Sequence, residues 1–133
     1  MQRAAEIHRR LAEGYPLILK GETEELLALI DPDIVDHRGG VQGDHVGKAA
    51  WKEKWDGMAA RDETGFRDVS VTIEQNVEAG DISVNRYASR GTHSASGRSY
   101  EVLGMDMVRV RDGRVVEHWA VRDSDAIRHQ LGQ

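Results

Sequence analysis

The sequence contains no cysteine, and this absence limits the sites that the chain can build. A disulfide framework, a zinc–thiolate centre and a cysteine nucleophile are all excluded. At 133 residues the chain still has the length of one domain, which can bury a core without cross-links or metal ions. We therefore expect a single domain over residues 1–133.

Long apolar runs and stripes of positive charge are missing as well. No segment approaches the roughly 20 apolar residues of a membrane span, and the N-terminal residues lack the apolar centre of a signal peptide. The 18 basic residues are interspersed with 23 acidic ones, and the formal net charge is −5. These absences predict a soluble, cytoplasmic protein without a membrane or nucleic-acid partner.

Proline occurs only twice, so hydrophobic periodicity decides the expected helices. Apolar residues at helical spacing predict a first helix that Pro16 bends just after Tyr15 and that stops near Gly21. Thr23 is a typical N-cap residue and predicts a short second helix, which Asp31-Pro32-Asp33 ends. A brief strand over 34–37 and glycine-rich loops lead from there to a third helix.

That third helix is indicated by Trp51, Trp55 and Met58, which lie three and four residues apart. From Phe66 onward the apolar period becomes two, as in half-buried strands, and turn residues divide this half into antiparallel hairpins. Helices followed by such strands define an α+β fold with the helices on one sheet face. The other face is expected to be solvated or covered by a second subunit, and exposed Leu103, Met105 and Trp119 on it would favour the second subunit.

Asp106 is the first candidate for chemistry, because it is the only acid on an otherwise apolar strand face that includes Val102, Val108 and Val110. A carboxyl group there either finds a hydrogen-bond partner or has its pKa raised by desolvation. It is therefore a candidate acid–base group. The alternatives are that the face is solvated, or that Asp106 pairs with Arg86 as a structural ion pair.

Asp36 and His37 end the first predicted strand, just before Gly39 and Gly40, which leave room for a ligand. His37 titrates near neutrality and could take and return a proton, with Asp36 orienting it or acting itself. Neighbours on a strand point to opposite faces, so only one of the two can enter a given cavity. The alternative is that His37 is a loop residue bonded to backbone.

His118 shares its strand face with Ala120 and Arg122 and is expected to face inward. Trp51 and Trp55 are expected to pack in the core and to contact a ligand as well. Four residues could converge on a metal ion, but they lack the short spacing of metal ligands, so we expect no metal site. They are His37, His93, His118 and Asp106.

Short strings across nearly the whole chain resemble the SnoaL-like polyketide cyclases. The resemblance rests on Asp31–His37, Gly47–Trp55, Arg90–His93, Asp112–Trp119 and Gln130–Gly132, of which Asp112–Trp119 is the most specific. It implies the cone-shaped fold of ketosteroid isomerases and nuclear-transport-factor-like domains. It also implies a curved antiparallel sheet wrapped around the N-terminal helices, a deep apolar pocket, and dimerisation through the outer sheet face.

The resemblance further implies aldol chemistry without a cofactor. The cyclases carry an acid–base aspartate directly after the tryptophan of the last strand, where this chain has Ala120. Ketosteroid isomerases use a tyrosine, a protonated aspartate and a base aspartate, which correspond by order to Tyr15, Asp106, and Asp36 or His37. In that scheme the apolar face keeps Asp106 neutral.

We therefore predict an enzyme that moves protons on a small, apolar carbonyl compound. A ligand-binding module without activity and an epoxide hydrolase-like enzyme, which needs a second buried acid near Asp106, are the alternatives. The predicted catalytic residues are Tyr15, Asp36, His37, Asp106 and His118, and the predicted substrate-binding residues are Trp51, Trp55, His93, Ala120 and Arg122.

Overall fold

The computed structural model describes residues 3–38 and 43–132. The predicted loop at Gly39 and Gly40 lies outside the described residues. Helix α1 (Ala4–Glu13) and helix α2 (Tyr15–Leu19) replace the single bent helix that the sequence predicts. The break falls at Gly14, where a Cβ would lie 2.6 Å from Leu26 Cδ1, while Pro16 stands in the first turn of α2, where a missing N–H costs nothing.

Helix α3 (Glu24–Leu27) follows Thr23, whose side chain makes no capping hydrogen bond. Strand β1 begins at Ile30 and runs to His37, so the prediction that Asp31-Pro32-Asp33 ends a helix is wrong. The register between β1 and β6 shifts between Ile30 and Val35. Pro32 lies within this irregular stretch, where its missing backbone N–H does not interrupt a regular ladder of hydrogen bonds. Ile30 and Ile34 are fully buried, and each such side chain contributes about 1.5–3 kcal/mol by leaving water.

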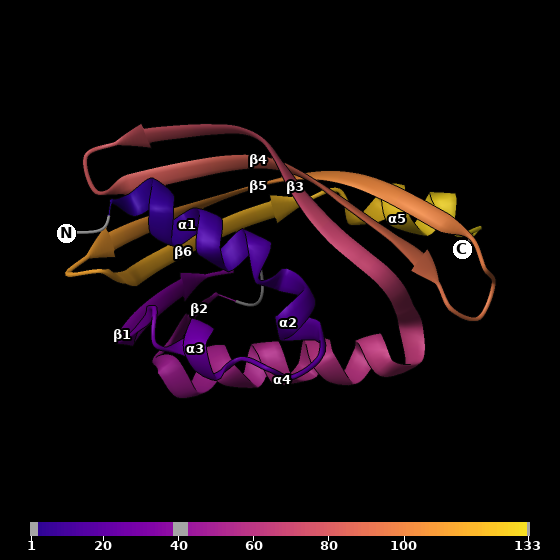
Figure 1. The fold of residues 1–133 in the computed structure, drawn as a ribbon, viewed down its shortest axis with the longest axis horizontal. Coiled ribbons are helices and arrows are strands. Elements are labelled where there is room, and N and C mark those ends of the chain that lie inside the picture. Colours follow the sequence, from indigo (N-terminus) through magenta and orange to yellow (C-terminus); the bar gives the residue numbers. More distant parts are fainter. Residues whose placement is uncertain (1–2, 39–42, 133) are drawn as a thin grey trace.

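The sheet is curled and open, with the strand order β2-β1-β6-β5-β4-β3 (Figure 1). Its remaining strands are β2 (Asp44–Val46), β3 (Phe66–Ala79), β4 (Ile82–His93), β5 (Ser99–Arg111) and β6 (Arg114–Arg122). The predicted hairpins β3–β4, β4–β5 and β5–β6 are confirmed as antiparallel pairs. β1 instead pairs with β6 in parallel, which the sequence does not predict.

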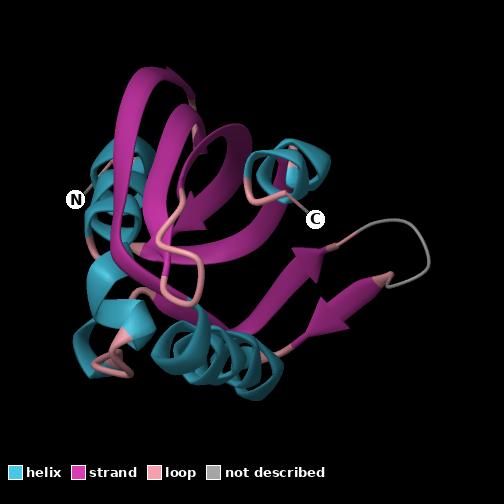
Figure 2. Cartoon of the chain, turned by 90° about the vertical axis from the view of Figure 1, so that its right-hand side faces the viewer, coloured by secondary structure: helices cyan, strands magenta, loops and turns pink. Residues whose placement is uncertain are grey.

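Helix α4 (Lys48–Gly65) is the predicted third helix, and helix α5 (Ser124–Gln130), capped by the Asp123 side chain, is an additional one. Figure 2 shows the strands curving between α1 on one side and α5 on the other, with α4 lying across the end. None of the described helices is long and apolar enough to span a membrane. The core joins Ile7, Trp51, Trp55 and the inner side of the sheet.

The strand register divides the sheet into two faces. Asp106 lies directly across from Ala120, and Val108 lies across from His118, so these residues share the inner face that α1 and α4 cover. Met105 lies across from Val121, and Met107 lies across from Trp119, on the outer face. The α+β fold, with a curved sheet around the N-terminal helices, is confirmed.

Candidate functional site

Asp36 is the most heavily contacted carboxylate of the inner face, and it is almost fully buried. Its Oδ2 accepts hydrogen bonds from Lys54 Nζ at 2.8 Å and from Arg38 Nε at 2.9 Å, and its Oδ1 lies 2.9 Å from His118 Nδ1. Burial by itself would raise the pKa of Asp36, but His118 and Lys54 outweigh it and hold the pKa far below its usual value. Asp36 is therefore ionised and too weak a base to take a proton itself.

His118 lies between two carboxylates. Its Nδ1 contacts Asp36, and its Nε2 lies 3.5 Å from Asp106 Oδ2. Desolvation alone would lower the pKa of His118, but the bonds to Asp106 and Asp36 raise it above 6.5. Trp51 meets the imidazole edge-on, with the ring centroids 5.1 Å apart. An imidazole held in this way can exchange a proton near neutral pH.

Asp106 faces two imidazoles, because His8 Nε2 lies 3.0 Å from Oδ1 and His118 lies beyond Oδ2. Although burial would raise it, the imidazoles of His118 and His8 beside the carboxylate lower the pKa of Asp106 to about 2. The prediction of a neutral Asp106 is therefore wrong. The alternative of a structural pair with Arg86 is wrong too, since Arg86 Nη1 lies 3.4 Å from Glu74 Oε2.

Two members of this network, His8 and Lys54, are missing from the sequence-based prediction. Lys54 Nζ lies 3.5 Å from the centroid of the Trp51 ring, and burial lowers its pKa although Asp36 opposes the shift. A usable signal exists for Lys54, which follows Trp51 by three residues and so shares its side of the helix. His8 sits next to Ile7 on α1 and carries no comparable signal.

Tyr87 is a further inner-face residue that the sequence does not indicate as part of the site. Burial raises its pKa, and the nearby charge of Asp106 raises it further, so the phenol stays protonated. The ring lies over Gly104, where a Cβ would come within 2.5 Å of its hydroxyl oxygen. Tyr15 packs against the core and interacts electrostatically with Tyr87, which itself interacts with Asp106.

His37 lies apart from this network. Its ring stacks on Trp119 at 4.8 Å, and its two nitrogens contact Asp44 at 2.9 Å and Glu117 at 3.0 Å. The bond to Glu117 is the main cause that raises the pKa of His37. His37 therefore belongs to the outer face beside Trp119, and its partners are side chains rather than backbone.

The other predicted site residues divide between the network and its surroundings. Trp55 is buried in the core, and Ala120 is the cross-strand neighbour of Asp106. His93 lies at the end of β4, 2.8 Å from Ser96 Oγ and tilted against Phe66. Arg122 is the cross-strand neighbour of Gly104, and it lines an open cleft of about 290 Å³ together with Leu103, Met105 and Val121 of the outer face.

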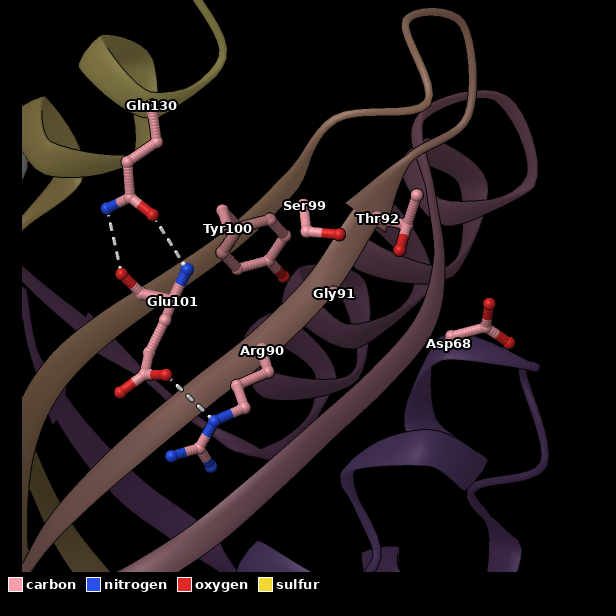
Figure 3. Close-up of a pocket in the computed structure, with 8 residues that line it drawn as sticks. All are labelled: Asp68, Arg90, Gly91, Thr92, Ser99, Tyr100, Glu101 and Gln130. Atoms are coloured by element: carbon pink, nitrogen blue, oxygen red, sulfur yellow. Dashed lines mark hydrogen bonds and ion pairs between the residues drawn. The ribbon is translucent and has the colours of Figure 1, made fainter.

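A larger open cleft of about 450 Å³ lies between the ends of β4 and β5 and helix α5 (Figure 3). There the side-chain amide of Gln130 accepts a hydrogen bond from the backbone N–H of Glu101 and donates one to its carbonyl oxygen. The Glu101 carboxylate accepts a hydrogen bond from Arg90 Nε at 3.0 Å. None of the predicted site residues lines this cleft. The enclosed apolar hollow beside Asp106 stays a prediction.

The inner-face network stands on a fold that known proteins share. The sequence profile of the SnoaL-like domain matches residues 5–118, which is most of the chain. The chain belongs to the SnoaL-like domain family. Wild-type IdmH from Streptomyces antibioticus, itself a proposed polyketide cyclase, is 31% identical to this SnoaL-like domain. The match covers 99% of this chain and 100% of that chain, and the TM-score is 0.79.

A loop-truncation variant of IdmH gives 33% identity over 98% of this chain and 100% of that one, with a TM-score of 0.78. A Catenulispora acidiphila protein with a ketosteroid isomerase-like fold, solved with trimethylamine, is 19% identical over 96% of this chain and 92% of that chain, with a TM-score of 0.73. The second likeness shows the fold alone. Among curated proteins, no sequence matches this SnoaL-like domain.

Proposed function

We propose that this SnoaL-like domain is an enzyme that abstracts a proton next to the carbonyl group of a small, apolar compound, as an aldol cyclase or an isomerase does. The observation that carries the proposal is His118, held between the ionised carboxylates of Asp36 and Asp106. Both carboxylates increase the proton affinity of the imidazole and stabilise the imidazolium that forms when it accepts a proton. The proposal includes no cofactor and a cytoplasmic location.

In the proposed reaction, His118 and Asp106 act as one base once His118 is neutral. The substrate proton leaves carbon and is shared between His118 Nε2 and Asp106 Oδ2, which lie 3.5 Å apart. The electron pair of the C–H bond moves into the carbonyl group and forms an enolate. Tyr87, kept protonated by its surroundings, and Tyr15 donate hydrogen bonds to the enolate oxygen.

The enolate then has two fates, which define the two reaction types. Return of the proton to another carbon gives an isomer and regenerates the base. Attack of the enolate carbon on a second carbonyl carbon closes a ring, and the proton from the base ends on the new alkoxide. Ala120 does not argue against the second fate, because Asp106 supplies a carboxylate directly across the strand pair from it.

The test measures exchange of substrate protons for deuterium by NMR in a panel of cyclic ketones and β-keto esters. We expect His118→Gln and Asp106→Asn to slow exchange by roughly 10²-fold or more. The matched control is His129→Gln, which changes an exposed histidine of α5. The rate in the parent protein should rise with pH through the raised pKa of His118, because the base must be neutral. Exchange that survives in His118→Gln would refute the proposal.

Hydrolytic opening of an epoxide is a second candidate, and one observation favours it. It requires a second buried acid near Asp106, and Asp36 meets this condition on the other side of His118. Incorporation of oxygen from ¹⁸O-water into a diol, without exchange at carbon, would support hydrolysis instead. Binding of a ketone with neither reaction would support a ligand-binding module.

We also propose that two copies associate through the outer sheet face. Leu103, Met105 and Val121 are 43%, 46% and 70% exposed there, and they line one cleft rather than being scattered singly. The resemblance to the cyclases implies the same association.

A further inference from the structure

A string of polar side chains leads from Asn76, on the exposed side of β3, through buried Ser83 and His8 to Asp106. Asn76 Nδ2 lies 3.2 Å from the Val84 carbonyl oxygen, 2.8 Å from Ser83 Oγ and 2.7 Å from Asn85 Oδ1. A backbone carbonyl can only accept a hydrogen bond, so the atom beside it must be the amide nitrogen of Asn76. The string therefore begins with a donor whose orientation is fixed.

The fixed donor of Asn76 determines where the hydroxyl proton of Ser83 points, and this in turn determines the tautomer of His8. Ser83 is fully buried, and Asn76 and His8 are the partners of its hydroxyl group in the described part of the chain. Because Oγ accepts from Asn76, its own proton has one partner left, His8 Nδ1 at 2.7 Å. His8 Nδ1 is then an acceptor without a proton, and the proton of the neutral ring lies on Nε2.

The Nε2–H group of His8 is 3.0 Å from Asp106 Oδ1. The contact is close but not well aligned, and such hydrogen bonds often tighten only when substrate is bound. It occupies one oxygen of the carboxylate. The other oxygen, Oδ2, faces His118 at 3.5 Å and is left free of His8.

We propose that His8 is a positioning residue, locked by Ser83 in its Nε2–H tautomer so that it binds Asp106 Oδ1 and leaves Oδ2 as the reacting oxygen. This inference rests on the proposed function, and it adds which oxygen reacts and what fixes it. His8 itself is almost completely buried and does not touch substrate. A carboxylate free to rotate would divide its time between productive and unproductive orientations, and His8 prevents this.

The first test needs no substrate. Nitrogen-15 NMR of the imidazole rings distinguishes the two tautomers, and we expect a protonated Nε2 and an unprotonated Nδ1 for His8 at neutral pH. In Ser83→Ala the lock is removed, and we expect a mixture of tautomers. A proton on Nδ1 of His8 in the parent protein would overturn the proposal, whatever reaction the protein catalyses.

The second test separates positioning from folding. His8→Leu removes both contacts, His8→Gln keeps an N–H group that can reach Asp106, and Ile7→Val is the matched control on the same buried turn of α1. We expect His8→Leu to lower kcat by on the order of 10- to 100-fold with little change in KM, and His8→Gln to recover part of the loss. The pKa of Asp106, followed by carbon-13 NMR, should rise by about one unit in His8→Leu.

The outcomes distinguish the two proposals. If Asp106→Asn leaves proton exchange intact, the proposed function fails. The tautomer measurement, which needs no substrate, still tests whether Ser83 fixes the Nε2–H tautomer of His8. If Asp106→Asn is inactive while His8→Leu keeps the parent kcat and the parent pKa of Asp106, only the positioning role fails. A loss of kcat in Ile7→Val equal to that in His8→Leu would assign the effect to packing and overturn the role as well.

Discussion

Gly104 is a residue at which the structure leaves no room for a side chain, because the Tyr87 ring lies over it. A Cβ at this position would approach Tyr87 Cζ and Oη to 2.5 Å. We expect Gly104→Ala to displace the ring, to destabilise the fold by about 1–3 kcal/mol and to slow proton exchange. Gly65→Ala is the control, since its Cβ meets nothing within 4 Å. Chemical denaturation and the exchange assay measure both effects, and wild-type values for Gly104→Ala would contradict the assigned role of Tyr87.

The pair Asp106 and Ala120 offers a second prediction at the residue scale. The two residues face each other across β5 and β6, so a carboxylate on either strand reaches the same part of the inner face. We expect Asp106→Ala to lose activity and the double variant Asp106→Ala/Ala120→Asp to recover at least a tenth of the parent rate, a cost of about 1.4 kcal/mol or less. Recovery in the absence of His118, measured in the triple variant with His118→Gln, would argue against the shared base.

Sequence reasoning named Asp106 and His118 because each is a polar residue on a strand whose neighbours predict an inner face, and it named Asp36 because that residue ends a predicted strand just before glycines. It did not find the ionisation of Asp106. The pKa of that residue depends on His8 and His118, which are 98 and 12 positions away in the chain and meet it only in the folded protein. Burial alone raises the pKa of a carboxyl group, and only the partners reverse the sign.

At the scale of the elements, the side chain of His37 in β1 connects this strand to β2 and β6, and we call this set of contacts the clasp. It joins Asp44 of β2 to Glu117 of β6, and Glu117 accepts a hydrogen bond from Arg109 of β5 at 3.0 Å. The raised pKa of His37 means that the clasp stabilises the fold fully below pH 6.5, its unfolded value, and loses this contribution as pH rises through the folded value. The groups are partly exposed, so the contribution is of the order of a surface pair.

We therefore expect His37→Gln to lower the free energy of unfolding by about 1 kcal/mol at pH 6 and by less at pH 9. Urea denaturation at the two pH values measures the difference. Asp44→Asn, which keeps the stack of His37 on Trp119, should show a smaller pH-dependent loss. An equal loss in His37→Gln at both pH values would mean that stacking alone stabilises this corner.

Most elements follow from local patterns, and the exceptions have physical causes. The hairpins were predictable because turn residues and an apolar period of two coincide in β3 to β6. The start of β1 was not, because Pro32 usually marks a boundary and here sits where the register slips. The parallel pairing of β1 with β6 joins segments about 80 residues apart, which no local pattern specifies.

For the whole molecule, the exposed apolar side chains of the outer face predict association. We expect sedimentation velocity to show a dimer at micromolar concentration. The double variant Met105→Glu/Val121→Asp should be a monomer, because dimerisation would remove the two new carboxylates from water without a partner. Leu17→Asp, a change at an exposed apolar residue of helix α2, is the control. A parent protein that stays monomeric at high concentration would contradict this prediction.

The sequence by itself determined the α+β class, the helices and hairpins, the likeness to SnoaL-like cyclases, and an isolated acid on an apolar strand face, because periodicity and turn chemistry are local properties. Only the tertiary structure decided which groups surround that acid. It brings His8 from α1, Lys54 from α4, Asp36 from β1 and His118 from β6 to one buried place. There, at short distance and away from water, their charges set one another's protonation, and so determine which of them can move a proton.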